Sequence, residues 1–329
     1  MKTYLGVDGG GSKTAFMLID ESGRVLASHT EGSAYYLEIG WDELRGMLAN
    51  GIRTVLAAGS VPPSSLEFAY LGLPAYGEDS RLLAQFDTVP SPLLAPGRFR
   101  CGNDAVCGWA GALGCEDGIN LVAGTGSIGY GEYQGRTARA GGWGELFSDE
   151  GSAHWMAREA LRLFSRMSDG RTPRGPWYEM LKGHFGLQED LDLCAAIYGD
   201  GAAARSRIAT LAPLASRAAH AGDLEITALF HRAAHELAAI VHAVFDRLEI
   251  SDAATVNVSY SGGMFAERAL LLEPFIAELL RGPRKYRVSA PRLLPAAGAA
   301  LYAAKLRGAP LGAEAVRRLE SHSTSLSFA

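Results

Sequence analysis

Cysteine, an excess of basic charge and long apolar runs are all scarce or missing in this sequence, and each shortage excludes a class of protein. Four cysteines among 329 residues are too few for the disulfide framework of a small secreted scaffold. The 31 Lys and Arg against 36 Asp and Glu leave a net charge of −5, which argues against binding to nucleic acid. No apolar run approaches the length of a membrane-spanning helix, and no signal peptide precedes the first predicted strand. We therefore expect a cytoplasmic protein with reduced thiols that contacts neither nucleic acid nor membrane.

What the sequence does contain is glycine, gathered in short clusters between apolar runs. The first cluster follows an apolar run over residues 4–7 that leads into Asp8, and a second apolar run begins at Ala15. Between them lie, in order, Gly9, Gly10, Gly11, Ser12, Lys13 and Thr14. The pattern predicts two strands joined by a glycine turn. Glycine lets backbone N–H groups approach an anion such as phosphate, and Asp8 at the mouth of the turn can hold a hydrated Mg²⁺.

Two familiar phosphate motifs differ from this turn. In the P-loop, Gly and Lys are adjacent and open a helix, whereas Ser12 separates Gly11 from Lys13 here and a strand follows. A dinucleotide-binding fingerprint also requires a helix after its glycines. For this stretch alone an ordinary hairpin turn remains the alternative, so its interpretation depends on the rest of the chain.

The same order of elements recurs further along. A second glycine turn consists of Gly124, Thr125, Gly126 and Ser127. It lies between predicted strands at 119–123 and 128–133, and a third strand at 136–140 follows. Two copies of such a unit predict an internally duplicated architecture, in which each half is a mixed β-sheet flanked by helices.

The last third of the chain completes the second half. Residues 178–248 are rich in alanine and predicted to be mostly helical. A strand at 254–260 runs into Ser261-Gly262-Gly263, which is predicted to open a helix over 265–280. A last helix begins at Pro295, and its small residues are suited to close packing.

Four motifs in this order resemble the sugar kinase, Hsp70 and actin superfamily, and within it the BadF/BadG/BcrA/BcrD branch. They are residues 8–14, Asn103-Asp104-Ala105, Gly124-Thr125-Gly126-Ser127, and Ser261-Gly262-Gly263 with Ala297-Gly298-Ala299 after it. More narrowly, Gly142-Trp143-Gly144 followed by Asp149-Glu150-Gly151-Ser152 resembles N-acetylglucosamine kinases.

The resemblance implies an α/β fold of two ribonuclease-H-like, actin-like ATPase lobes, each a mixed sheet flanked by helices, with an active-site cleft between them. The N-terminal lobe would span residues 1–116, with a C-terminal helix at 296–329 packing back onto it, and the C-terminal lobe residues 117–295. The implied activity is ATP- and Mg²⁺-dependent phosphorylation of the 6-hydroxyl of an amino sugar. N-acetylglucosamine is the first candidate, followed by glucosamine and N-acetylmuramate. Related kinases are commonly homodimers, so a homodimer is expected.

The resemblance also implies a role for each motif. Asp8 would hold Mg²⁺ through water, and Asp104 would act as base on the sugar hydroxyl. The turns at 9–14 and 124–127 would cradle the phosphates, and Gly262 and Gly263 would let adenosine pack against backbone. The sugar site would consist of Asn103, Asp104, Gly142, Trp143, Gly144 and Asp149. These residue types suit phosphoryl transfer, which needs positioning, charge neutralisation and a carboxylate that takes the hydroxyl proton.

Several of these residues have an ordinary structural alternative. Asp104 and Asp149 each precede a predicted helix and can be N-caps, and Trp143 can belong to the core. His231 and His235 lie four apart on a predicted helix, a spacing seen in metal sites, yet the rest of a zinc motif is absent.

One loop departs from the pattern of N-acetylglucosamine kinases, which usually carry an Asn after the third strand. Here residues 32–36 read Gly-Ser-Ala-Tyr-Tyr. If Ala34 takes the place of that Asn, a sugar contact is lost and space is gained, which suggests a bulkier sugar such as a muramic acid derivative. Two other functions remain open. One is an ATPase that activates a radical dehydratase through a cysteine-held Fe–S cluster, and the other is a non-catalytic sugar sensor.

Overall fold

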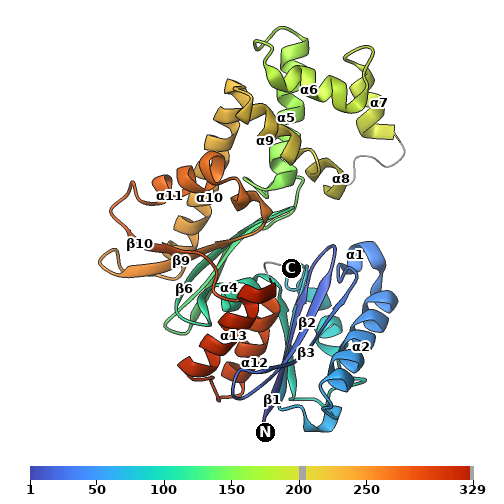
Figure 1. Ribbon diagram of the computed structural model, residues 1–329, viewed down its shortest axis with the longest axis vertical. Coiled ribbons are helices and arrows are strands. Elements are labelled where there is room, and N and C mark those ends of the chain that lie inside the picture. Colours follow the sequence, from blue (N-terminus) through green and yellow to red (C-terminus); the bar gives the residue numbers. More distant parts are fainter. Residues whose placement is uncertain (200–204, 327–329) are drawn as a thin grey trace. The chain divides into compact units, whose positions relative to one another are not determined.

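The structure is a computed structural model that describes residues 1–199 and 205–326, with side chains as far as residue 322. It divides into two compact units, the first formed by Met1–Gly118 and Ala290–Ala329 and the second by Ile119–Ser289. We call them unit 1 and unit 2. Each contains a five-stranded mixed sheet flanked by helices, which confirms the predicted fold class (Figure 1).

The sheet of unit 1 has the strand order β3-β2-β1-β4-β5. Its strands are β1 (Thr3–Gly9), β2 (Thr14–Asp20), β3 (Val25–Glu31), β4 (Phe68–Leu73) and β5 (Phe99–Asn103). The first three are antiparallel neighbours, whereas β1, β4 and β5 run parallel. Because side chains alternate along a strand, Leu5 and Val7 enter the core beneath α2 (Trp41–Ala58), while Gly6 faces α12 (Pro295–Leu306). Because β1, β4 and β5 run parallel, their carboxyl ends lie at the same edge of the sheet.

Helices cover both faces of this sheet. α2 lies along one side, and α12 and α13 (Ala313–Leu326) lie on the other (Figure 1). The remaining helices are α1 (Tyr36–Ile39), α3 (Leu83–Thr88) and α4 (Ala105–Leu113), with 3₁₀ turns at Pro63–Ser65 and Ser80–Leu82. α2 buries Leu44, Leu48, Ile52 and Val55, whose spacing of three to four residues places them on one helix face.

The C-terminal segment is two helices rather than the single helix predicted at 296–329. α12 ends at Leu306, and Gly308 has a φ of 75°, a conformation that glycine adopts without strain. Pro310 follows and cannot continue a helix, so α13 starts afresh at Ala313. Residues 327–329 of the predicted helix lie outside the described residues. α12 contacts β1, β4 and α4.

The sheet of unit 2 has the strand order β10-β9-β6-β7-β8. Its strands are β6 (Gly118–Ala123), β7 (Ser127–Tyr133), β8 (Arg136–Gly141), β9 (Thr255–Ser261) and β10 (Lys285–Ser289). β7 and β8 form an antiparallel hairpin, whereas β6, β9 and β10 run parallel. The parallel pairing of β6 with β9 brings the ends of two strands, each followed by a glycine-containing segment, to the same edge of the sheet.

Helices make up most of the rest of unit 2. They are α5 (Ala153–Ser168), α6 (Pro176–Phe185), α7 (Asp192–Tyr198), α8 (Arg205–Ala209), α9 (Ala212–His220), α10 (Leu224–Arg247) and α11 (Glu273–Leu279). The single helix predicted over 265–280 is wrong. A 3₁₀ turn (Gly263–Ala266) and a π turn (Arg268–Leu272) precede α11. Pro274 lies in the first turn of α11 and has no N–H to continue a helix from upstream.

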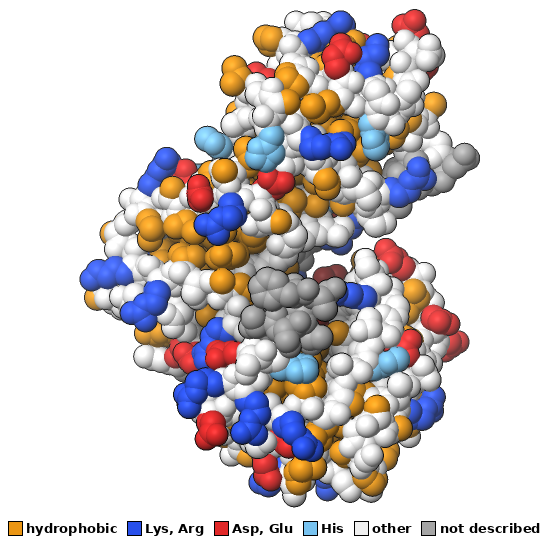
Figure 2. Space-filling model, viewed as in Figure 1, with side chains coloured by type: hydrophobic (Ala, Val, Ile, Leu, Met, Phe, Trp, Pro, Cys, Tyr) orange, Lys and Arg blue, Asp and Glu red, His pale blue; other side chains and the backbone are white. Residues whose placement is uncertain are grey.

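The surface is mixed in charge. Lys and Arg side chains are interspersed with Asp and Glu side chains over the visible face of each unit (Figure 2). Among the described residues, the helices are all too short or too polar to cross a membrane.

Candidate active site

The first glycine turn connects β1 to β2 and is fastened to the loop that follows β3. The hydroxyl of Thr14 donates to the carbonyl of Gly32 over 2.8 Å, and the backbone N–H of Ala34 donates to the carbonyl of Gly10 over 2.9 Å. Thr14 is fully buried, whereas Gly11, Ser12 and Lys13 are exposed. The turn is thus anchored at its base and free at its tip, where backbone N–H groups can meet a ligand.

Asp8 and Asp104 lie together at the carboxyl edge of the unit 1 sheet. Asp8, the last residue but one of β1, pairs with Gly72 of β4, and a Cβ added at Gly72 would lie 2.2 Å from Sγ of Cys107 and 3.1 Å from Cα of Asp104. Burial and the nearby charge of Asp104 raise the pKa of Asp8 to about 7, against the opposing effects of Lys13 and the Cys107 thiol. The structure therefore brings together the residues predicted to hold a metal and to act as base.

The segment around Asp104 shows how this carboxylate is presented. Oδ1 of Asn103 accepts a hydrogen bond from the N–H of Ala105 over 3.1 Å, and its Nδ2 donates to the carbonyl of Tyr76 over 3.3 Å. Asp104 is the first residue of the turn into α4, yet its side chain makes no capping hydrogen bond. The N-cap alternative for Asp104 is wrong, because Asn103 supplies the local contact.

The second glycine turn is built against the start of α5 in unit 2. The N–H of Ala153 donates to the carbonyl of Gly124 over 2.9 Å, and the hydroxyl of Ser127 donates to the carbonyl of Glu150 over 2.7 Å. Gly262, at the end of β9, has a φ of 101°, and a Cβ added there would lie 2.3 Å from the carbonyl oxygen of Ala123. The two glycine segments of unit 2 are therefore in contact.

Asp149 lies beneath this turn rather than in an open pocket. It has a φ of 61° and is 2% exposed, and its Oδ2 accepts a hydrogen bond from Nη2 of Arg205 over 2.6 Å. Burial raises the pKa of Asp149, while Arg205 and the N–H of Ser127 oppose that shift. The helix-cap alternative for Asp149 is wrong, because Ser152 caps α5 by accepting from the N–H of Trp155.

Trp143 is at the surface, whereas Asp149 is buried. The side chain of Trp143 is 73% exposed, so the alternative that it belongs to the core is wrong. It lines a pocket of about 420 Å³ between β8 and α10, together with Phe147, Ser148, Glu150 and Glu236 among others. Gly142 and Gly144, which flank it, have φ values of 67° and 98°, and Arg139 holds the loop by donating to the carbonyl of Gly142.

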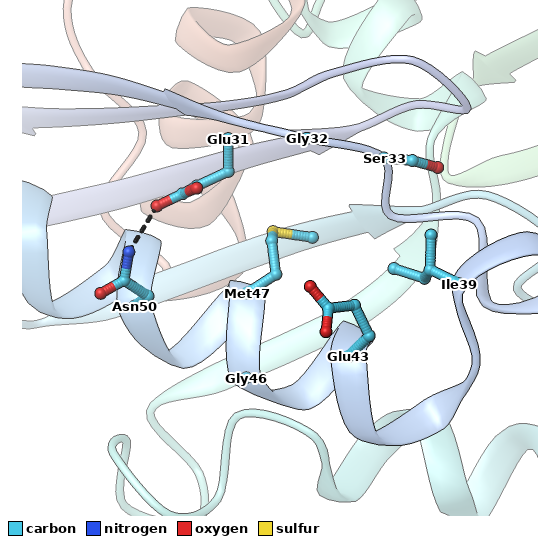
Figure 3. A pocket seen from close by; sticks show the side chains of 8 residues that line it. All are labelled: Glu31, Gly32, Ser33, Ile39, Glu43, Gly46, Met47 and Asn50. Carbon is cyan, nitrogen blue, oxygen red and sulfur yellow. Dashed lines mark hydrogen bonds between the residues drawn. The ribbon is translucent and has the colours of Figure 1, made fainter.

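A second pocket lies in unit 1 beside the Gly32-Ser33-Ala34 loop. It measures about 340 Å³, and Figure 3 shows the side chain of Glu31, at the end of β3, pointing toward Asn50 of α2, with Met47 and Glu43 further along the same helix. The carboxylate of Glu31 accepts a hydrogen bond from Asn50 over 2.7 Å.

Ala34 itself is absent from this pocket and fully buried in the core. Its Cβ lies 3.0 Å from the position that a Cβ on Gly9 would occupy. The methyl group of Ala34 therefore packs in the core next to the first turn, and the bulkier sugar suggested for this loop stays a prediction.

A resident metal cage is absent from the described residues, since no cluster of three or more His, Cys, Asp and Glu could hold an ion there. His231 and His235 are both exposed, and His235 lies 3.7 Å from Glu278. The two carboxylates Asp8 and Asp104 remain, which suits an ion that takes most of its ligands from phosphate and water.

Two residues of the site, Arg205 and Cys107, are not predicted from the sequence. Arg205 pairs with Asp149 across 56 residues and sits in an alanine-rich helical region without any motif. Cys107 lies one helical turn after Asp104, and its Sγ contacts the carbonyl of Val7 over 3.5 Å. No local pattern marks either residue, because each is placed only by the tertiary fold.

Similarity to known proteins identifies the family of this chain. The BadF/BadG/BcrA/BcrD ATPase family matches residues 5–303. This chain belongs to that family. N-acetyl-D-glucosamine kinase of Dictyostelium discoideum is 26% identical over 310 residues, which cover 91% of this chain and 97% of that protein. The N-acetylmuramic acid/N-acetylglucosamine kinase of Clostridium acetobutylicum is 30% identical over 284 residues, covering 84% and 89%.

Solved structures agree on the fold. A protein from Chromobacterium violaceum, provisionally named an N-acetylglucosamine kinase, superposes with a TM-score of 0.71 at 28% identity and covers 92% of this chain and 98% of its own. A ROK family glucokinase from Streptomyces griseus, in complex with glucose and AMPPNP, gives a TM-score of 0.51 at 19% identity, covering 92% and 100%. The chain has the actin-like ATPase fold of these sugar kinases.

Proposed function

We propose that this protein is an ATP-dependent amino-sugar kinase that phosphorylates the 6-hydroxyl of its substrate, with N-acetylglucosamine as the first candidate and glucosamine and N-acetylmuramate as further ones. The observation that carries the proposal is the pair Asp8 and Asp104 at the carboxyl edge of the unit 1 sheet, beside an anchored glycine turn. Relatives over most of the chain are kinases of these sugars, which supports the same chemistry here.

Asp104 is proposed as the base. In the transfer, the 6-oxygen of the sugar forms a bond to the γ-phosphorus of ATP and the bond from that phosphorus to the bridging oxygen breaks, releasing ADP. The hydroxyl proton passes to the Asp104 carboxylate as the oxygen attacks. The Asp104 side chain makes no capping hydrogen bond at the N-terminus of α4.

Mg²⁺ fits the carboxylates of unit 1. Burial, and then the negative charge of Asp104, raise the pKa of Asp8, and a divalent cation would offset that nearby charge. Asp8 would hold the ion through water. When bound, Mg²⁺ neutralises charge on the phosphates during transfer.

The remaining predicted contacts are those to the phosphates, the adenosine and the sugar. Each glycine turn is proposed to bind phosphate. The turn of unit 1 consists of Gly9, Gly10, Gly11, Ser12, Lys13 and Thr14, and that of unit 2 consists of Gly124, Thr125, Gly126 and Ser127. Gly262 and Gly263 would receive adenosine. Asn103, Asp104, Gly142, Trp143, Gly144 and Asp149 would bind the sugar. A cytoplasmic location and a homodimer complete the proposal, and sedimentation of the purified chain would check the dimer.

ADP release in the presence of Mg-ATP tests the proposal over a panel of N-acetylglucosamine, glucosamine, N-acetylmuramate, N-acetylmannosamine and glucose. We expect one amino sugar to stimulate turnover and Asp104→Asn to lower kcat by about 10²- to 10⁴-fold while ATP still binds. The matched control is Asp42→Asn, the same change at an exposed position on α2. Absence of stimulation by every sugar, or equal activity of the two variants, would reject the assignment.

A further inference from the structure

Arg205 of unit 2 lies beside a proposed phosphate-binding turn, but the proposed phosphoryl transfer assigns it no role. It opens α8 and lies against the second glycine turn: a Cβ added at Gly126 would be 2.0 Å from its Nη2 and 2.8 Å from Oδ2 of Asp149. A side chain at residue 126 would therefore displace the guanidinium of Arg205 or the carboxylate of Asp149. The Arg205 side chain is 32% exposed, so it is partly enclosed but reachable from solvent.

The guanidinium is incompletely used. Nη2 donates to Asp149 over 2.6 Å, and Nη1 lies 3.7 Å from Glu145, a distance too long for a hydrogen bond. Nε is buried and has no hydrogen-bond partner among the described residues. A guanidinium presents five N–H donors in a planar fork that matches the two oxygens of a carboxylate or phosphate. Among the described residues, most of these N–H donors therefore have no acceptor.

We propose that Arg205 binds an oxyanion of the reactants at the Gly124–Ser127 turn, either a phosphate of ATP or a carboxylate carried by the sugar. This inference rests on the proposed kinase function and adds a binding residue to it. Asp149 alone would repel either anion from the turn. With Arg205 paired to it, the local charge is balanced and the unused face of the fork remains available to the reactant.

The two sources of the oxyanion are separated by the choice of ligand. AMPPNP carries phosphates, N-acetylmuramate carries a carboxylate, and N-acetylglucosamine carries neither. Dissociation constants for all three are measured by calorimetry on the full chain, for the wild type, Arg205→Met and Arg207→Met. Arg207 lies two residues further along α8 and is exposed, so its replacement removes the same charge from the same helix away from the turn.

We expect Arg205→Met to weaken binding of one anion at least 10-fold and Arg207→Met to change it less than 2-fold. Loss confined to AMPPNP assigns the fork to a phosphate, and loss confined to N-acetylmuramate assigns it to a substrate carboxylate. Equal constants for the two variants with both anions overturn the proposal. Because binding is measured directly, this result is independent of turnover, whose absence in the wild type would reject the kinase function alone.

A purely structural role for Arg205 predicts a different pattern. If the arginine only neutralises buried Asp149, then Arg205→Met should have no further effect on anion binding in an Asp149→Asn background. An anion-binding role predicts that the same loss persists there. Arg205→Lys keeps the charge but not the fork, and we expect it to restore part of the affinity. Should Arg205→Met fail to fold, the lysine variant and the double variant carry the same comparison, and wild-type affinity in both would overturn the proposal.

Discussion

Gly298 of α12 lies directly against Gly111 of α4, because a Cβ added at Gly298 would fall 2.0 Å from the backbone nitrogen of Gly111. The obstacle is backbone, which cannot rotate away as a side chain can. We expect Gly298→Ala to force the helices apart and cost about 3 kcal/mol or more in the free energy of unfolding. Gly46→Ala on α2 is the control, since nothing lies within 4 Å and alanine favours the helix by about 0.5–1 kcal/mol. Thermal unfolding measures both, and equal Tm values would contradict this packing.

The adjacent glycines 262 and 263 should respond differently to the same substitution. Gly262 has a φ of 101° and faces the carbonyl oxygen of Ala123 at 2.3 Å, whereas nothing lies within 4 Å of a Cβ at Gly263. We expect Gly262→Ala to destabilise the protein by roughly 2 kcal/mol or more. Gly263→Ala should leave Tm almost unchanged, so any rise in its KM for ATP would report close approach of the nucleotide to the backbone. An unchanged KM would remove Gly263 from the proposed adenosine contact.

Asp8 should make stability depend on pH. Its pKa is raised to about 7 in the folded protein, above the ordinary value of 3.8, so folding disfavours the charged form. The stability associated with protonated Asp8 is complete below about pH 4 and is lost as the pH rises to 7. Asp8→Asn removes this titration, so its advantage in Tm over the wild type should grow from pH 5 to pH 7 and then level off. A constant difference between the two proteins across pH 5–8, without metal, would exclude the raised pKa.

Much of the fold could be predicted because local sequence decides it. β4 (Phe68–Leu73) is a short apolar run between turn residues, and α4 (Ala105–Leu113) follows a polar Asn-Asp pair and ends at Gly114, whose φ of 63° suits a helix C-terminus. The duplicated order of strands and glycine turns then indicated two sheets. Where the prediction was wrong, as in the single helix expected at 265–280, a proline inside an apolar run changed the helix type without changing its hydrophobic pattern.

The site was predictable only in part. The motifs at Asp8 and Asp104 carry their own signal, and the parallel pairing of β1, β4 and β5 brings them together. The partnership of Asp149 with Arg205 has no such signal, because it depends on how α8 packs in unit 2. Ala34 shows the opposite case, in which a motif position turned out to be a core residue.

Thr14 offers a test of the anchor between the first turn and the loop after β3. Its buried hydroxyl donates to the carbonyl of Gly32 over 2.8 Å, so Thr14→Val leaves that carbonyl without its donor at nearly constant volume. We expect a loss of about 1–2 kcal/mol in stability and a higher KM for ATP, because the turn is no longer held at its base. Thr14→Ser keeps the hydroxyl and should retain most of the ATP affinity despite losing a methyl group. If the serine variant instead raises KM as much as the valine variant, packing of the methyl group and not the hydrogen bond positions the turn.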